Sequence, residues 1–256
     1  MDLAQFNEAL NLYVRPQTFP LAVRMTENEQ ELPPRARRPV KDLGGTMPAC
    51  QAWGTARRYG WTIAMGTEDQ TCPYGALTMG FHPPKDGFLS GDYPGPFPSK
   101  EAASTAHASI KRLDYGSYKY IVFAPITNAA FEPHVVIVYG NSAQVMRLVQ
   151  GAVFFRGGTV EATASGGMDC ADLITHPMVS EECHFVLPCN GDRIFGLAQD
   201  HEMAFTMPWS LADEVVKGLE TGHKSGLQRY PIPAYMRFQA EMPERYRQLM
   251  DYIQEG

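Results

Sequence analysis

A chain of 256 residues with 44% apolar and 20% charged residues has the composition of a folded globular protein rather than a disordered one. Its formal net charge of -6 leaves no excess of basic residues to neutralise phosphates, which argues against nucleic acid and anionic membranes as partners. No stretch approaches the roughly 20 apolar residues that span a bilayer, and residues 1–9 lack the apolar core of a secretion signal. We therefore expect a cytoplasmic protein with no nucleic-acid or membrane partner.

The N-terminal region alternates short regular elements with a polar segment. Apolar residues three or four positions apart predict a helix over residues 3–14, which Pro16 ends, and a strand follows at 21–25. Residues 26–46 are polar and rich in Pro and Arg, so we expect a surface loop there. The basic run within 35–38 should then be solvated.

The middle of the chain carries the strongest strand signals. Residues 118–126 and 134–139 are rich in β-branched and aromatic side chains, and the unbroken apolar run in the second predicts a strand buried on both faces. Residues 85–99 are rich in Pro and Gly, which predicts a second surface loop. The remaining expected elements are strands at 61–65, 159–164, 184–187 and 202–207, and helices at 142–150, 211–219 (capped by Ser210) and 243–253.

The order of these elements indicates an α/β fold (mixed α+β). Strands and helices alternate without a regular βαβ rhythm, so we expect a single domain over residues 1–256 with a central mixed β-sheet flanked by helices. The familiar signatures of nucleotide-binding proteins and hydrolases are absent, and so is C-x-x-C. The seven histidines are scattered without metal-ligand spacing, so we expect surface or core roles for them. A homo-oligomer is compatible with this composition.

The five cysteines carry the clearest chemical signal. In a reducing compartment they favour a metal site or a reactive thiol over disulfides. Cys50 follows Thr46, a favourable N-cap, and Pro48, a residue suited to a first turn, so it falls at the start of a predicted helix. Cys72 stands directly before a proline and a second short helix, at the capping position.

Two further cysteines follow the same logic. Cys170 comes after a Gly-Gly pair and opens another short predicted helix, whereas Cys189 lies in a turn after a strand. Gly191 then allows the chain to turn, and Asp192 and Arg193 are candidates for supporting a cofactor or ligand. A structural ion pair that fixes this turn explains Asp192 and Arg193 equally well.

These placements matter because a helix N-terminus offers free N–H groups and about half a positive charge, which favours a thiolate or an anionic cluster. We therefore expect Cys50, Cys72, Cys170 and Cys189 to lie together at one centre. Cys183, in a polar run beside a histidine, should lie apart.

Several blocks of the sequence also occur together in a known family. They are PLAV at 20–23, Cys50-Gln51-Ala52, Cys72 with Gly75-Ala76, Cys170, PCNGDR at 188–193, and Glu202-Met203. In this order, over roughly residues 19–219, they resemble domain-of-unknown-function family 169, known mainly from archaea and anaerobic bacteria. The resemblance implies no activity. It does imply that the four cysteines are special positions, and an anaerobic setting fits an oxygen-sensitive iron–sulfur centre.

The first hypothesis is an iron–sulfur protein in which the four cysteines hold one [4Fe–4S] cluster, with an electron-transfer or redox role and a redox partner protein or small-molecule ligand. The long intervals between the cysteines argue against it, because ferredoxin-like sites draw three ligands from one tight loop. A structural zinc site with the same ligands is the alternative, as is a metal-free ligand-binding domain. A thiol enzyme is a further alternative, with Cys170 or Cys50 as nucleophile and His184 or His201 as base.

Overall fold

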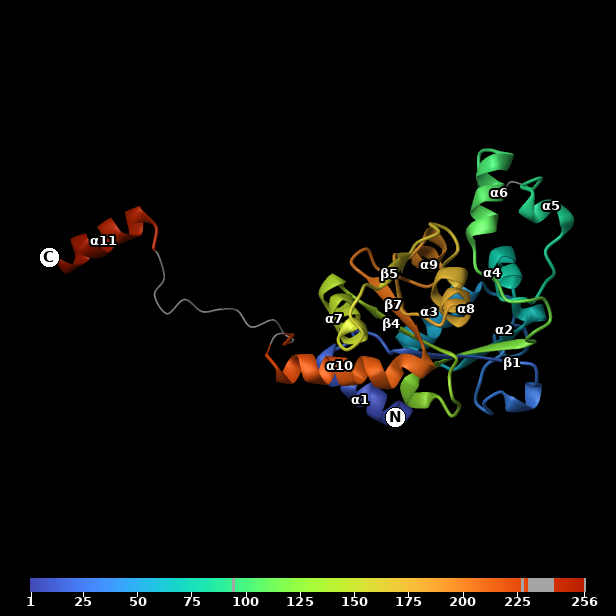
Figure 1. The fold of residues 1–256 in the computed structure, drawn as a ribbon, viewed down its shortest axis with the longest axis horizontal. Helices are drawn as coiled ribbons and strands as arrows, with labels where there is room; N and C mark the ends of the chain where they lie inside the picture. The colour runs from blue at the N-terminus through green and yellow to red at the C-terminus, as the bar shows by residue number, and fades with distance from the viewer. Residues whose placement is uncertain (94, 227, 230–241, 256) are drawn as a thin grey trace.

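A seven-stranded β-sheet forms the centre of the protein (Figure 1), in a computed structural model that describes residues 1–93, 95–226, 228–229 and 242–255. The strand order is β2-β3-β1-β4-β7-β6-β5, and every neighbouring pair is antiparallel except β5 and β6. The strands are β1 (Leu21–Thr26), β2 (Ile63–Gly66), β3 (Tyr120–Pro125), β4 (Val135–Gly140), β5 (Glu161–Thr163), β6 (His184–Val186) and β7 (Met203–Pro208). The predicted mixed α/β class is thereby confirmed.

Helices cover both faces of this sheet. On one face α1, α7 and α10 pack together, and on the other lie α3, α4 and the helical segment that includes α8 (Figure 1). The α-helices are α1 (Leu3–Tyr13), α2 (Pro39–Leu43), α3 (Ala49–Tyr59), α4 (Pro73–Thr78), α5 (Asp86–Leu89), α6 (Lys100–Ser109), α7 (Ser142–Val153), α8 (His176–Ser180), α9 (Asn190–Ile194), α10 (Ala212–Lys224) and α11 (Glu244–Gln254). A π-helical turn, Ala171–Thr175, leads into α8, and short 3-10 helices occur at Glu29–Glu31, Thr67–Asp69, Ile126–Asn128 and Trp209–Leu211.

Strand β4 shows how the sequence produces the two cores. Its residues 135–140 are all buried, as the continuous apolar run predicted. Because successive side chains of a strand point to opposite faces, Val135 and Ile137 join the core beneath α3 and α4. Val136 and Val138 join the core beneath α1, α7 and α10. Helices therefore have to cover both sides of this strand.

Two glycines let α7 and α10 approach closely. A Cβ atom on Gly218 would lie 2.1 Å from the carbonyl oxygen of Gly151, far inside van der Waals contact. The hydrophobic residues of α10 can therefore reach the same apolar core as Leu148 of α7 and Phe6 of α1. Helix α10 is longer than the predicted 211–219, and the expected Ser210 cap is not used, because Trp209–Leu211 forms a 3-10 turn ahead of it.

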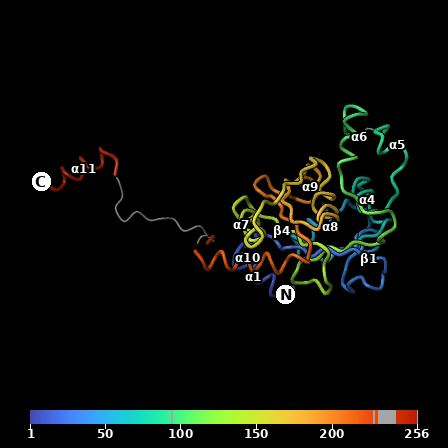
Figure 2. Tube along the Cα trace, viewed as in Figure 1, coloured from blue at the N-terminus to red at the C-terminus, as the bar shows by residue number. Residues whose placement is uncertain are grey.

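Residues 85–99 form part of a projecting arm with α5 and α6 (Figure 2). The segment was predicted as a surface loop, and most of it is exposed, but it contains the single turn α5 and a buried Phe88. The ring of Phe88 stacks on His107 of α6 at 3.9 Å between centroids. Helix α6 was not predicted, because its alanine-rich sequence has no stripe of large apolar residues.

The predicted loop at 26–46 is also mostly exposed but not irregular throughout. It includes α2, and Arg38 directly before it is buried rather than solvated, which corrects the expectation for the basic run. The Arg38 guanidinium pairs with buried Asp69 at 2.7 Å and also contacts Glu68. A carboxylate partner brought by the 3-10 turn after β2 is what makes this burial tolerable. In the described part of the chain, no helix is long and apolar enough to cross a membrane.

Candidate cysteine site

The four cysteines singled out from the sequence all lie at the N-terminal ends of helical segments. Cys50 is the second residue of α3, which begins after Pro48 rather than at the expected Thr46 cap. Cys72 directly precedes α4, and Cys170 lies in the first turn of the segment that continues into α8. Cys189 directly precedes α9, a short helix where only a turn was expected. Backbone N–H groups without helical partners therefore surround all four positions.

The four thiols lie within electrostatic reach of one another. Burial raises the pKa of the Cys50 thiol, and negative charge on Asp192 or on any of the other three cysteines raises it further. The same holds for Cys170, whose pKa is raised by burial and also by charge on Cys72 and Cys189. All five cysteines of the chain are free thiols. The fold thus gathers four reduced sulfurs from four helical segments.

The expectation that helix N-termini would favour thiolates is wrong for three of these thiols. Burial raises the pKa of Cys50 and Cys170 strongly and that of Cys189 to about 11. Loss of solvation outweighs the field of the short helices. Cys72 is partly exposed, whereas the other three are buried.

Cys183 lies apart, on the other side of the sheet. It belongs to the core beneath α1, α7 and α10, whereas Cys50 and Cys170 belong to the core beneath α3 and α4. Burial raises its pKa to about 12. It is therefore a buried thiol without a place in the cysteine site.

Asp169 is a neighbour of the site that the sequence analysis did not single out. One of its carboxyl oxygens accepts a hydrogen bond from the Cys189 backbone N–H at 2.8 Å, so it joins the cysteine beside it, Cys170, to Cys189. Its other oxygen, Oδ1, is buried and has no hydrogen-bond partner among the described residues. Burial raises the pKa of this carboxyl to about 7. The only sequence signal for it is an acidic residue next to a helix-terminal cysteine.

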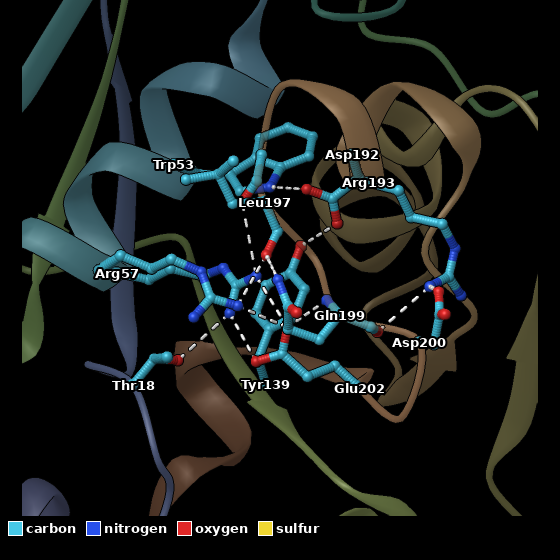
Figure 3. A network of polar contacts seen from close by, with 12 residues as sticks. Thr18, Trp53, Arg57, Tyr139, Asp192, Arg193, Leu197, Gln199, Asp200 and Glu202 are labelled. Carbon is cyan, nitrogen blue, oxygen red and sulfur yellow. Dashed lines mark hydrogen bonds and ion pairs between the residues drawn. The ribbon is translucent and has the colours of Figure 1, made fainter.

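Asp192 of α9 is a buried hydrogen-bond acceptor (Figure 3). The Trp53 indole N–H donates to its Oδ1 at 2.8 Å, and the Tyr139 hydroxyl donates to its Oδ2 at 2.7 Å. Burial raises its pKa despite these donors. Asp192 therefore ties the helix that follows Cys189 to α3 and β4.

Arg57 on α3 completes the same network (Figure 3). Its side chain is fully buried, its Nη1 lies 2.9 Å from Glu202 Oε1, and its guanidinium lies 4.0 Å from the centre of the Tyr139 ring. Arg58 pairs with the same carboxylate at 2.9 Å. These ion pairs with Glu202 fix α3, the helix that carries Cys50, to the segment before β7. The sequence analysis named Glu202 only as part of a shared block and assigned no role to it or to Arg57.

Arg193 contacts the loops on both sides of α9. Its guanidinium donates to the carbonyl oxygens of Pro188 and Gln199 and pairs with the exposed Asp200 at 3.1 Å (Figure 3). Asp192 and Arg193 therefore do not pair with each other, and Arg193 fixes the loop on both sides of α9. Gly191 has no left-handed backbone conformation and lies within α9, where an added Cβ would sit 3.7 Å from Cys189 Sγ.

The structure bears on two alternatives, the single-metal site and the thiol enzyme with a histidine base. Among the described residues, no group of three or more His, Cys, Asp and Glu side chains is close enough to hold one metal ion. His184 bonds Ser180 at 2.9 Å and packs against His176, so in the described part of the chain no hydrogen bond joins it to Cys50 or Cys170. His201 is exposed. Neither histidine is placed as a base for those thiols.

Comparisons with known proteins identify a family but no activity. A family profile described as "Uncharacterised ArCR", domain-of-unknown-function family 169, matches residues 9–218. An uncharacterized protein of Methanocaldococcus jannaschii is 24% identical over 205 residues, which cover 78% of this chain and 86% of that protein. No solved structure matches. The matched range includes all four cysteines of the site.

Proposed function

The chain belongs to domain-of-unknown-function family 169, and we propose that it is an iron–sulfur protein in which Cys50, Cys72, Cys170 and Cys189 hold one cluster, most simply [4Fe–4S]. The observation that carries the proposal is the meeting of four free thiols, each from a different helical N-terminus and each within electrostatic reach of Cys50. Four cysteine ligands satisfy the coordination of such a cluster.

A cluster and a single zinc ion require different spacings of the sulfurs. Four sulfurs bound to one zinc at 2.3 Å lie about 3.8 Å apart in a tetrahedron. A cluster keeps its cysteines further apart, because each one binds a different iron. Metal and sulfide content therefore distinguishes the two kinds of centre.

The surroundings also suit an anionic cluster. The four helical N-termini leave backbone N–H groups without helical partners, and donors of this kind stabilise sulfur that carries negative charge. The Thr78 hydroxyl already donates to Cys170 Sγ at 3.4 Å. Because the buried thiols have raised pKa values, ligand binding would release protons from them.

When bound, such a cluster would supply one-electron transfer. The chain's own residues would set its environment: apolar burial from α3 and the segment before α8, and N–H donors from four helices. The proposal includes a redox partner protein or a small-molecule ligand as the other participant.

Metal and sulfide analysis of the full chain purified without oxygen tests the proposal. We expect iron and acid-labile sulfide in equal amounts, about four of each per chain, with a brown chromophore. Replacing any one of Cys50, Cys72, Cys170 and Cys189 by Ser should lower the iron content at least several-fold. The matched control is Cys183→Ser, which removes a buried thiol on the other side of the sheet and should retain the iron.

Three results would contradict the proposal. Zinc without sulfide would establish a structural zinc site. One indispensable cysteine instead of four would favour a thiol nucleophile. Protein with neither metal nor sulfide after reconstitution with iron and sulfide would leave a ligand-binding domain.

A further inference from the structure

Helix α4 lies beside the projecting arm (Figure 1), and Cys72 of the cysteine site directly precedes it. One side of the helix faces the core, where Ala76 and Met79 are buried with Cys50 and Cys170. A Cβ on Gly75 would lie 3.9 Å from the Cβ atoms of both Ala49 and Cys72, so α4 begins directly against the start of α3. The cysteine site therefore lies along the inner side of this short helix.

The other side of α4 lines a cavity of about 740 Å³. Pro73 and Leu77, four residues apart on one helix face, form one wall of the cavity. Phe88 and Tyr93 from the arm line it as well, with Lys85 beside them. A largely apolar cavity of this size with few polar groups is typical of a small-molecule site.

The arm holds one side of the cavity in place. Phe88 stacks on the buried His107, and the His107 Nδ1 bonds the Phe88 carbonyl oxygen at 2.7 Å. Tyr74 of α4 bonds the other ring nitrogen of His107 at 3.3 Å. These contacts join α4, α5 and α6, so the cavity is formed before any ligand enters.

The charges in the cavity select a kind of ligand. Asp92 is already occupied, since it accepts from Ser90 at 2.5 Å and pairs with Lys100. Lys85 makes no ion pair with any residue that the structure describes, and it lines the cavity together with apolar side chains. A cation next to an apolar cavity complements a ligand with a hydrocarbon body and one anionic group.

We propose that this cavity binds a small apolar acid, with its hydrocarbon or aromatic body between Leu77 and Phe88 and its anionic group on Lys85. Because Cys72 directly precedes Pro73, such a ligand would lie beside the cysteine site. The binding depends on the cavity alone. The idea that this ligand binds beside a redox centre rests on the proposed function.

Fluorescence titration with anilinonaphthalene sulfonate, an aromatic probe with one anionic group, tests this inference. We expect saturable binding of one probe per chain. Leu77→Trp fills the cavity and should weaken the affinity roughly tenfold or more, whereas the control Leu89→Trp, an exposed residue of the arm outside the cavity, should leave it unchanged. Lys85→Glu should also weaken it roughly tenfold, and the control Lys119→Glu should not.

An uncharged analogue, phenylnaphthylamine, separates the two parts of the inference. It should bind wild-type and Lys85→Glu protein alike but lose affinity with Leu77→Trp. Equal affinities of Leu77→Trp and Leu89→Trp for both probes would overturn the site, and an unchanged affinity of Lys85→Glu for the sulfonate would overturn the acidic ligand. The same titration on Cys72→Ser protein, which should bind normally, keeps the result independent of the cluster. Near-UV circular dichroism verifies that each variant is folded.

Discussion

The two faces of the central sheet bury side chains of different character. Beneath α1, α7 and α10 the buried side chains are mostly apolar, with Gln144, Arg147 and the Cys183 thiol as exceptions, and two glycines allow the helices to pack closely. Beneath α3, α4 and α9 the interior also holds the guanidinium of Arg57, the carboxyls of Asp169 and Asp192, and three buried thiols. One face thus resembles an ordinary helical layer, and the other resembles the lining of a functional site.

This difference favours the face beneath α3, α4 and α9 as the location of a functional site. A buried polar group reduces stability unless it is paired, so a face built for stability alone would not collect so many of them. The helices also differ: α7 and α10 have 12 and 13 residues, whereas α4 and α9 have 6 and 5. Short helices bring several N-termini close together, and that suits an anionic centre more than a stable layer.

The largest expected effect concerns Arg57. Arg57→Ala leaves the buried Glu202 carboxylate without its main partner, which should lower the free energy of unfolding by about 3–5 kcal/mol in urea titrations. Because α3 also carries Cys50, the iron content should fall with it. Arg156→Ala, which breaks the more exposed pair with Glu182, should cost about 1 kcal/mol or less.

The matched control for Arg57 lies on the opposite face. Leu148→Ala should lower the free energy of unfolding by a comparable amount, about 2–5 kcal/mol, because it creates a cavity in the apolar core. The iron content of the folded fraction should not change. Equal loss of iron in both variants would mean that the two faces do not divide stability from function.

A smaller effect concerns β6, the strand between β7 and the edge strand β5. His184 points to the same face as Val186 in the cysteine-side core, and burial lowers its pKa from 6.5 to about 4. Between these values the unfolded chain binds a proton that the folded chain does not, so stability should fall by up to about 3 kcal/mol as the pH drops from 6.5 to 4. In urea titrations across this pH range, the unfolding midpoint of His184→Gln should depend less on pH than that of the wild type. The midpoint of His201→Gln should keep the wild-type pH dependence.

The smallest effect is expected at Arg193. Its ion pair with the exposed Asp200 lies in solvent, so Arg193→Ala should change the free energy of unfolding by about 1 kcal/mol or less. Its bonds to the Pro188 and Gln199 carbonyl oxygens hold the loop around Cys189, and Arg193→Lys would lose their planar geometry. If the iron content falls sharply in Arg193→Lys while the free energy of unfolding stays unchanged, Arg193 supports the site rather than the stability of the fold.

Local patterns in the sequence predicted what depends on local physics. The apolar run at 134–139 predicted a strand buried on both faces, and Pro73 after Cys72 predicted a helix start. The alanine-rich α6 and the short α9 were missed, because neither has an apolar stripe long enough to read.

Tertiary effects could not be predicted in the same way. The pair between Arg57 and Glu202 joins residues 145 positions apart, and no local pattern indicates it. The raised pKa of Cys50 and Cys170 also follows from burial in the assembled core rather than from the helix start that the sequence showed. Nothing around Lys85 in the sequence indicated that its loop forms one side of a cavity.

Strand β1 lies in the interior of the sheet, and this position affects how the chain folds. This early strand pairs with β3 and β4, and α1 packs on α10, so the N-terminal elements wait for partners that are synthesised much later. At ribosomal rates of about 5–20 residues per second, α1 waits roughly 10–40 seconds for α10 to appear. During that time its apolar stripe is exposed to chaperones and to aggregation. The last cysteine of the site also emerges late, so any metal centre must be loaded after most of the chain has left the ribosome.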